Sequence, residues 1–369
     1  MEVRSRTHSA NEEFAVAKKS LISTFLKTLV SLAIIGFLSL AALELSLTLF
    51  LDNPEYLHGL LKSLMQEYSM AFDRDTVQLN PACAKADAVL TYILKPGQCR
   101  QKSREFDVQL SINSQGTRDD EDSLRQPEII VTGDSQAMGW GVEQEKNFAQ
   151  LLESATGKKV LNAAVPSYST SREIAALARY DLSKVKTLII QYCDNDYGEN
   201  LAFFNDGRKF PVIAPDRYQY LVNVYADQKK YYFGKHTWHV LGAAISRLTA
   251  KTADAKGNAK LPDGRTSNQA YEDALGANLF VDILNHAPVN LDGVQIILME
   301  VNSSNANDAF FIDAVKAIQH GKSNAEAVKN MVEIDLSKVL KPGNYYNLDD
   351  HMNASGHAAV MKQLLPFIH

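Results

Sequence analysis

From residue 127 to the C-terminus, short apolar runs alternate with longer segments of helical periodicity. The apolar runs are nearly continuous, as expected for strands of a parallel sheet that is covered on both faces. This alternation predicts an α/β fold, a three-layer α/β/α sandwich around a parallel five-stranded sheet. The predicted strands are 128–132, 159–162, 187–192, 294–301 and 331–336, and the predicted helices are 147–156, 171–181, 308–319 and 354–365.

The interval 200–290 interrupts this alternation. It contains several tyrosines, an apolar helix-like piece at 240–248 and a polar run at 250–267 that we expect to be a flexible surface loop. Because it follows the third predicted strand, we interpret the interval as an insertion that forms a cap or a partner surface. His236 and His239 have the spacing of metal ligands, but no cysteine or carboxylate cluster accompanies them, which favours surface or core histidines.

An apolar segment lies near the N-terminus at 28–51, with Glu44 as its only charged residue. About 20 such residues span a bilayer, so the segment is long enough to cross as one transmembrane helix. Basic residues precede it and acidic residues follow it, which predicts a loosely ordered cytoplasmic tail at 1–27 and the rest of the chain on the other side. Because a charge at mid-bilayer is costly, we expect Glu44 near the outer interface or against a partner helix.

A cleaved signal peptide is the alternative, and Ser39-Leu40-Ala41 is an acceptable cleavage site. The leading region is long and the apolar run continues past this site, which favours an uncleaved anchor.

Residues 52–126 form a membrane-proximal segment between the apolar helix and the sandwich. We expect a helix at 55–72 and an amphipathic strand at 106–112. If the domain is exported, Cys83 and Cys99 can form a disulfide across a short loop, whereas Cys193 is expected to be an unpaired core thiol. Three free thiols are the alternative.

The first predicted strand ends in Gly133-Asp134-Ser135. Ligands of open α/β sheets bind at the carboxyl ends of the strands, so a serine held there can be an exposed nucleophile. Taken alone, the tripeptide is also explained as a turn, because all three residue types favour turns. The nucleophile interpretation therefore depends on partners elsewhere in the chain.

A nucleophilic serine needs a base that takes its proton and a third group that orients the base. His351 is the candidate base, and its alternative role is to cap the last helix beside Asn353. Asp349 lies two residues earlier and, in an extended segment, points to the same side as His351, so it is the candidate orienting acid. Asp350 would point away unless the loop turns.

Donors for a developing oxyanion follow the next two predicted strands. Ala164 lies in the segment 162–169 and Asn195 in the segment 193–196, both on the sheet edge that carries Ser135. The backbone N–H groups of Ser135 and Ala164 and the side-chain amide of Asn195 are the three candidate donors of an oxyanion hole. The alternative for Asn195 is an ordinary turn residue.

Four blocks of the sequence carry these candidates: Gly133-Asp134-Ser135, residues 162–168, Asn195-Asp196 and Asp349-x-His351-x-Asn353-x-x-Gly356. In this order they resemble the SGNH/GDSL hydrolase family, and the likeness covers residues 127–369 apart from the insertion. Each block alone is weak, but four in order make a strong signal. The sequence departs from the family pattern in three places. Ala164 and Cys193 stand where the family usually has glycine, and the acid lies one residue closer to the histidine than in the commonest form.

The resemblance implies a flavodoxin-like sandwich, Ser135, Asp349 and His351 as catalytic residues, and chemistry that requires no metal or cofactor. Asn113-Ser114-x-Gly116 further resembles membrane-anchored bacterial members. We therefore expect a single-pass protein of the bacterial inner membrane with a periplasmic catalytic domain.

The expected activity is that of a serine esterase on ester-linked acyl groups of envelope carbohydrate, peptidoglycan or lipid. Two alternatives stay open: an O-acyltransferase to an envelope polysaccharide, and a non-catalytic SGNH-like assembly or binding component of the membrane. The formal net charge of −5 and the lack of a Lys/Arg-rich run argue against nucleic acid as a partner.

Overall fold

All five predicted strands form one parallel sheet in the computed structural model, in the order β6-β5-β7-β8-β9. The structure describes residues 2–210, 212–253, 261–263, 265–303 and 308–368. Strand β6 lies on one side of β5, and β7 lies on the other side. The strand order therefore changes direction between β5 and β7. Ligands of such sheets bind at this switch point. The strands are β5 (Ile129–Thr132), β6 (Val160–Asn162), β7 (Thr187–Tyr192), β8 (Gln295–Glu300) and β9 (Val332–Ile334).

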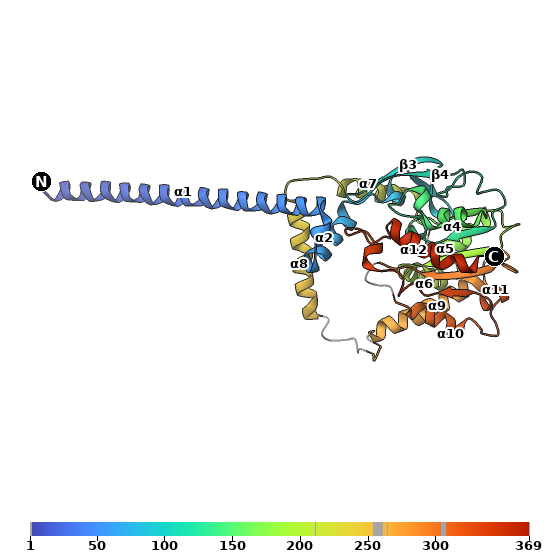
Figure 1. Cartoon of the computed structure of the whole chain (residues 1–369). Helices are drawn as coiled ribbons and strands as arrows, with labels where there is room; N and C mark the ends of the chain where they lie inside the picture. The colour runs from blue at the N-terminus through green and yellow to red at the C-terminus, as the bar shows by residue number, and fades with distance from the viewer. Residues whose placement is uncertain (1, 211, 254–260, 264, 304–307, 369) are drawn as a thin grey trace.

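Helices cover both faces of this sheet (Figure 1), which confirms the predicted three-layer sandwich. Alternate strand residues enter two separate cores, as the two-residue period of a strand requires. Ile129 and Val131 pack in the core that contains Phe148, whereas Ile130 packs in the core that contains Phe280. The first core is covered by α4 (Phe148–Thr156) and α12 (Ala354–Leu364), and the second by α5 (Thr170–Ala176), α9 (Ser267–Asn285), α10 (Phe310–Ile318) and α11 (Glu326–Lys329).

Helix α9 lies within the interval that we interpreted as an insertion, yet it belongs to the sandwich. Ala277, Phe280 and Leu284 recur at helical spacing and are buried against the sheet. The described residues between β7 and β8 contain no strand, as expected. Much of the predicted polar loop, at 254–260 and 264, lies outside the described residues. The remaining helices of the interval are α6 (Asp196–Asn205), α7 (Pro215–Gln228) and α8 (Lys235–Ala253).

Helix α1 (Glu2–Asp52) projects from the body as one continuous rod (Figure 1). Its stretch Lys18–Asp52, whose most apolar 18-residue window has a mean hydropathy of 2.1, is long and apolar enough to cross a membrane. The expectation of a loosely ordered tail before residue 28 is wrong, because the helix already begins at Glu2. Residues 2–27 contain no glycine or proline, so a helix nucleated in the apolar segment can propagate through them.

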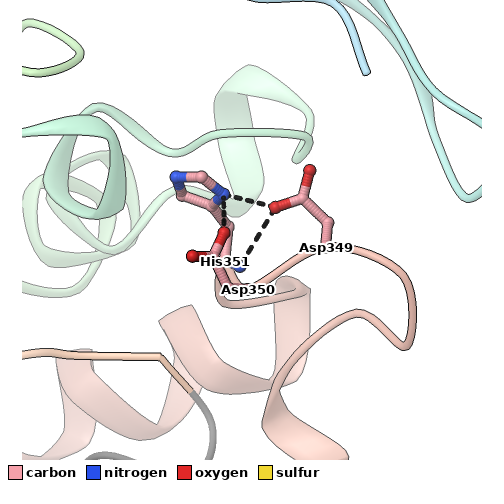
Figure 2. A group of neighbouring side chains, drawn as sticks. All are labelled: Asp349, Asp350 and His351. Carbon is pink, nitrogen blue, oxygen red and sulfur yellow. Dashed lines mark hydrogen bonds and ion pairs between the residues drawn. The ribbon is translucent and has the colours of Figure 1, made fainter. Parts of the chain in front are cut away.

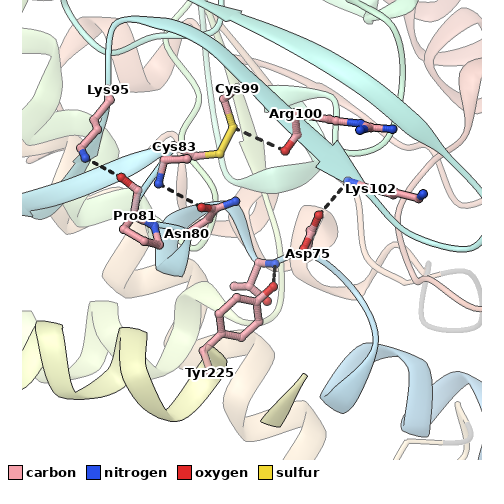
Figure 3. The surroundings of a disulfide bond; sticks show 11 residues. Asp75, Asn80, Pro81, Cys83, Lys95, Cys99, Arg100, Lys102 and Tyr225 are labelled. Atoms are coloured by element: carbon pink, nitrogen blue, oxygen red, sulfur yellow. Dashed lines mark hydrogen bonds between the residues drawn. A yellow bond between two sulfur atoms is a disulfide. The ribbon is translucent and has the colours of Figure 1, made fainter. Parts of the chain in front are cut away.

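The membrane-proximal segment contains a helix, two hairpins and the predicted disulfide. Helix α2 (Gly59–Phe72) follows a short turn of 3₁₀ helix, η1 (Pro54–Tyr56). Cys83 and Cys99 are bonded, with their Cα atoms 5.2 Å apart (Figure 3), and Cys193 is free and half-buried. The hairpins are β1 (Ala84–Asp87) with β2 (Thr91–Leu94), and β3 (Gly97–Lys102) with β4 (Asp107–Ile112).

Candidate active site

Ser135 is presented by a tight turn at the carboxyl end of β5. Gly133 has φ +152° and lies against Gln191, whose Oε1 would be only 2.6 Å from a Cβ atom at this position. The Gln191 Oε1 atom accepts hydrogen bonds from the N–H groups of Asp134 at 3.1 Å and Ala137 at 3.2 Å. Only glycine allows this close approach, and the turn delivers Ser135 to the first position of the short helix α3 (Ser135–Met138).

The structure brings Ser135, His351 and Asp349 together. Ser135 Oγ lies 2.6 Å from His351 Nε2, although the two residues are 216 positions apart in sequence. The other ring nitrogen, Nδ1, hydrogen-bonds to Asp349 Oδ1 (Figure 2). Ser135 is 9% exposed and Asp349 2% exposed, so the three groups meet in a largely dry setting with the serine at its edge. This arrangement allows the histidine to accept the serine proton while the carboxylate fixes the ring.

Asp350 also faces the histidine, because the loop turns, which is the stated exception to the expectation that it points away. Its Oδ1 lies 3.3 Å from His351 Nδ1. The alternation argument requires an extended segment, but residues 347–351 bend, and an isolated bridge between Tyr345 and Met352 closes the loop. Both carboxylates therefore approach the same imidazole nitrogen, as Figure 2 shows.

The last helix is capped by Asn353 rather than by His351. The Asn353 side chain accepts hydrogen bonds from the N–H groups of Ser355 at 2.9 Å and Gly356 at 3.2 Å. A Cβ atom on Gly356 would lie 2.5 Å from the carbonyl oxygen of Asn344, so glycine lets α12 start close to the preceding turn. The Asn-x-x-Gly part of the motif thus builds the helix start, and the His351 ring remains free to face Ser135.

Two side chains that the sequence reasoning missed support the acid and the base. The Trp140 ring stacks on His351 with centroids 4.8 Å apart, and its Nε1 donates to Asp349 Oδ2 at 3.2 Å. Arg74, which follows α2, donates to Asp350 Oδ1 at 3.2 Å and lies 3.7 Å from Asp349 Oδ1. Trp140 comes soon after the Gly-Asp-Ser turn, and this closeness in sequence was a signal that its side chain could lie near Ser135. No local pattern in the sequence links Arg74 to residue 350.

The environment of His351 favours the imidazolium form. Burial by itself lowers the pKa of His351, but the charges and hydrogen bonds of Asp349 and Asp350 outweigh it and raise the pKa to about 9. Burial raises the pKa of the Asp350 carboxyl, and the charges of His351 and Arg74 reverse this and hold that pKa well below its usual range. A proton taken from Ser135 would therefore be strongly stabilised on the ring.

The three candidate oxyanion donors have different environments. No acceptor for the Ser135 N–H is found among the described residues. Asn195 donates a side-chain N–H to Asp134 Oδ2 at 3.2 Å, which places its amide beside the Ser135 turn. The Ala164 N–H, in contrast, donates to the Asn162 side chain at 3.1 Å and is already engaged.

Asp349, Asp350 and His351 could also hold a metal ion by geometry, since each offers a ligand atom and these atoms lie within 4.8 Å of one another. In the structure the same atoms are used for other contacts. His351 Nδ1 is bonded to Asp349, Arg74 supplies the positive charge beside the carboxylates, and His351 Nε2 faces Ser135. The side chains of Asp349, Asp350 and His351 are therefore arranged for proton transfer.

No protein-family model matches the chain. No curated protein matches it either. Solved structures do match.

One match is a member of the lipolytic G-D-S-L family from Veillonella parvula, with 11% identity, a TM-score of 0.35, and 65% of this chain and 96% of that chain covered. An acetyl xylan esterase from the rumen bacterium Butyrivibrio proteoclasticus matches with 12% identity, a TM-score of 0.35, and 65% of this chain and 62% of that chain covered. A carbohydrate esterase matches with 13% identity, a TM-score of 0.38, and 80% and 85% covered. The first of these proteins is named for the G-D-S-L family that the sequence motifs resemble. Similarities of this size do not indicate a function. The geometry of Ser135, His351 and Asp349 is the observation that does.

Proposed function

We propose that this chain is a membrane-anchored serine hydrolase of the SGNH/GDSL type that acts on ester-linked acyl groups. The observation that carries the proposal is the 2.6 Å contact between Ser135 Oγ and His351 Nε2, with Asp349 on the second ring nitrogen. A serine, a histidine and a carboxylate that meet in this order are the minimal machinery for nucleophilic acyl transfer.

In the proposed reaction, His351 Nε2 accepts the Ser135 proton while Oγ attacks the ester carbonyl. The new C–O bond forms as the carbonyl electron pair moves onto oxygen, and collapse of this intermediate expels the alkoxide, which takes the proton from His351. A water molecule, or a sugar hydroxyl, then attacks the acyl-enzyme with the same base and regenerates Ser135. Asp349 stabilises the imidazolium in both halves of the reaction.

The proposed oxyanion hole consists of the Ser135 N–H and the Asn195 side-chain amide. A hydrogen bond to a developing oxyanion is worth about 3–4 kcal/mol in comparable sites. In this proposal the Ala164 N–H contributes only after it leaves Asn162.

The proposed location is the inner membrane, with the sandwich in the periplasm. The Cys83–Cys99 disulfide fits an oxidising compartment. Phe37, which precedes the alternative cleavage site, stacks on Phe233 with centroids 5.5 Å apart, so cleavage would remove a packing partner of the folded chain. Substrates available at this location are acylated envelope carbohydrates and lipids, including O-acetyl esters.

The test uses the full-length chain in membranes and a fluorophosphonate probe, which bonds to activated serines. We expect the wild type to be labelled, and Ser135→Ala to lose labelling and about 10⁶-fold in kcat for ester hydrolysis. A panel of esters from acetyl to long-chain then identifies the acyl group, and addition of an acceptor sugar separates transfer from hydrolysis. Absence of both labelling and turnover in a folded wild-type protein would reject the enzyme and favour the non-catalytic alternative.

A further inference from the structure

Helix α8 exposes one apolar face along its length. Trp238, Leu241, Ile245 and Leu248 follow one another at helical spacing and therefore lie on the same side. Their exposed fractions are 74%, 50%, 60% and 70%. A continuous apolar stripe with such exposure marks a surface that binds something apolar.

The opposite face of α8 packs on α2. His239 stacks on Phe72 with ring centroids 3.9 Å apart, and Arg247 donates to Ser63 Oγ at 3.0 Å. The histidines considered as metal ligands are thus packing residues, since His236 is 3% exposed and lies edge-on to Tyr68. Because one face is occupied by α2, the apolar stripe is directed away from the body of the molecule.

The N-terminal end of α8 is held by Glu44 of the apolar helix α1. Glu44 Oε2 accepts hydrogen bonds from the Thr237 N–H at 2.9 Å and the Thr237 hydroxyl at 2.8 Å, and Oε1 accepts from the Tyr231 hydroxyl at 3.1 Å. A carboxylate is stabilised at a helix N-terminus by the unpaired N–H groups there. Glu44 therefore lies against a partner helix, as expected, and fixes the direction of α8 relative to α1.

This contact lies at the C-terminal end of the uncharged stretch 28–43 of the apolar segment. Residues 28–43, between Lys27 and Glu44, rise about 24 Å at about 1.5 Å per residue. Lys27 can extend its ammonium group towards the headgroups, so this length suits a hydrocarbon core of about 30 Å. Figure 1 shows α8 running across the direction of α1, on the side of the body from which α1 projects. If α1 crosses a membrane, α8 lies along the membrane surface.

Aromatic residues gather at the same level. Tyr231, Tyr232 and Phe233 precede α8 and are each more than half exposed, and Trp238 is in its first turns. Tyrosine and tryptophan are enriched at membrane–water interfaces because their rings are apolar and their polar atoms are wet.

We infer that the segment 231–248 is a lipid-binding surface, seated at the headgroup–acyl boundary of the outer leaflet. The inference rests on the proposed membrane anchor and adds a second contact to it. The occupant is the lipid bilayer, because Glu44 holds the start of α8 against α1 and the stacked pair Phe37 and Phe233 joins the apolar surface of α1 to the segment 231–248. The α/β body is thereby held at a fixed orientation on the membrane.

The test is tryptophan emission from the full-length chain in phosphatidylcholine vesicles with and without brominated acyl chains, which quench nearby rings. Trp140 and Trp238 are the only tryptophans, so the difference between wild type and Trp238→Phe isolates Trp238. We expect at least about a two-fold fall of the Trp238 emission, since interfacial helices bury their apolar face about 5–10 Å into this boundary. Leu241→Gln combined with Ile245→Gln should weaken the quenching.

A matched control places the reporter elsewhere. Leu365→Trp in the Trp238→Phe background puts a partly exposed ring next to the C-terminus, which lies on the far side of the body from α1 (Figure 1). This ring should not be quenched. Resistance to carbonate extraction reports on the anchor separately, and fluorophosphonate labelling reports on the active site. Unquenched Trp238 in a carbonate-resistant, labelled protein would overturn the lipid-binding inference alone and would favour a membrane-protein partner for the stripe.

Discussion

The α/β sandwich and the membrane-proximal layer, formed by α2, α8 and the end of α1, are held together by different forces. The sandwich has two extensive apolar cores on the two faces of its sheet. The membrane-proximal layer has one small apolar cluster and depends on directional polar contacts, such as Glu44 with Thr237 and Arg247 with Glu67 at 2.7 Å. Apolar burial supplies most of the free energy of folding, whereas hydrogen bonds fix angles. The candidate site contains residues of both regions. Ser135 belongs to the sandwich, whereas Arg74 contacts Asp350 from the membrane-proximal layer.

The largest effect on stability should come from the sandwich. Phe280→Ala removes a fully buried ring that packs edge-on to Tyr192 and Phe311, and should lower the free energy of unfolding by about 3–5 kcal/mol. Denaturant unfolding of the full chain in detergent measures this, with the exposed Tyr271→Ala on the same helix as a control that should change little. Equal losses in both variants would contradict the assigned core.

A smaller and local effect should follow from Glu44→Ala. The change leaves the Thr237 hydroxyl and N–H without their carboxylate, at a cost of about 1–3 kcal/mol. Hydrogen exchange should accelerate in α8 and remain unchanged in β5 and β7. Uniform acceleration would mean that the layer and the sandwich unfold as one unit.

Trp140→Phe should affect catalysis more than stability. A phenylalanine ring retains an aromatic face for His351 but cannot donate to Asp349. We expect about a ten-fold fall in kcat, equivalent to about 1.4 kcal/mol, with KM unchanged, because the lost contact acts on the base rather than on the substrate. An unaltered kcat would show that Asp349 is positioned without this hydrogen bond.

The smallest change should be a shift in pH dependence. His351 can act as a base only in its neutral form. The rate of Ser135 labelling should therefore rise with pH, with a midpoint near the His351 pKa of about 9. Asp350→Asn removes a negative charge that raises this pKa and should move the midpoint to lower pH, whereas Asp350→Glu should not. In stability, the raised pKa gives a contribution that is fully present below the ordinary value of 6.5 and is lost as the pH rises through about 9. A midpoint that Asp350→Asn leaves in place would exclude Asp350 from the electrostatics of the base.

The strands of the sandwich were readable from sequence because each is a short apolar run between clear turn signals. The observed bounds of β7 equal the predicted ones, and those of β5, β6, β8 and β9 lie inside the predicted ranges. Helix α9 was hidden because the described residues between β7 and α9 contain no strand to mark the return to the sheet. Ser135, His351 and Asp349 could be nominated as partners because the chemistry of a nucleophilic serine requires them.

Three contacts around the candidate site were not readable in the same way. The approach of Asp350 to His351 depends on a bend that no local residue pattern specified, and the engagement of the Ala164 N–H depends on a rotamer of Asn162. Arg74 meets residue 350 only because α2 packs beside the loop that carries it. The first two contacts depend on local backbone and side-chain conformation, and the third arises from tertiary packing, which residue spacing does not encode.

Helix α2 touches the loop of the base directly, through Lys62 to Asn347 at 2.8 Å and Gln66 to the backbone of Asp349 at 3.4 Å. The reactive centre is therefore assembled from opposite ends of the polypeptide. On the proposed topology, a chain that is still being translocated carries its serine across the membrane long before its imidazole. On that topology, the proposed pair of Ser135 and His351 is complete only after both residues have been exported.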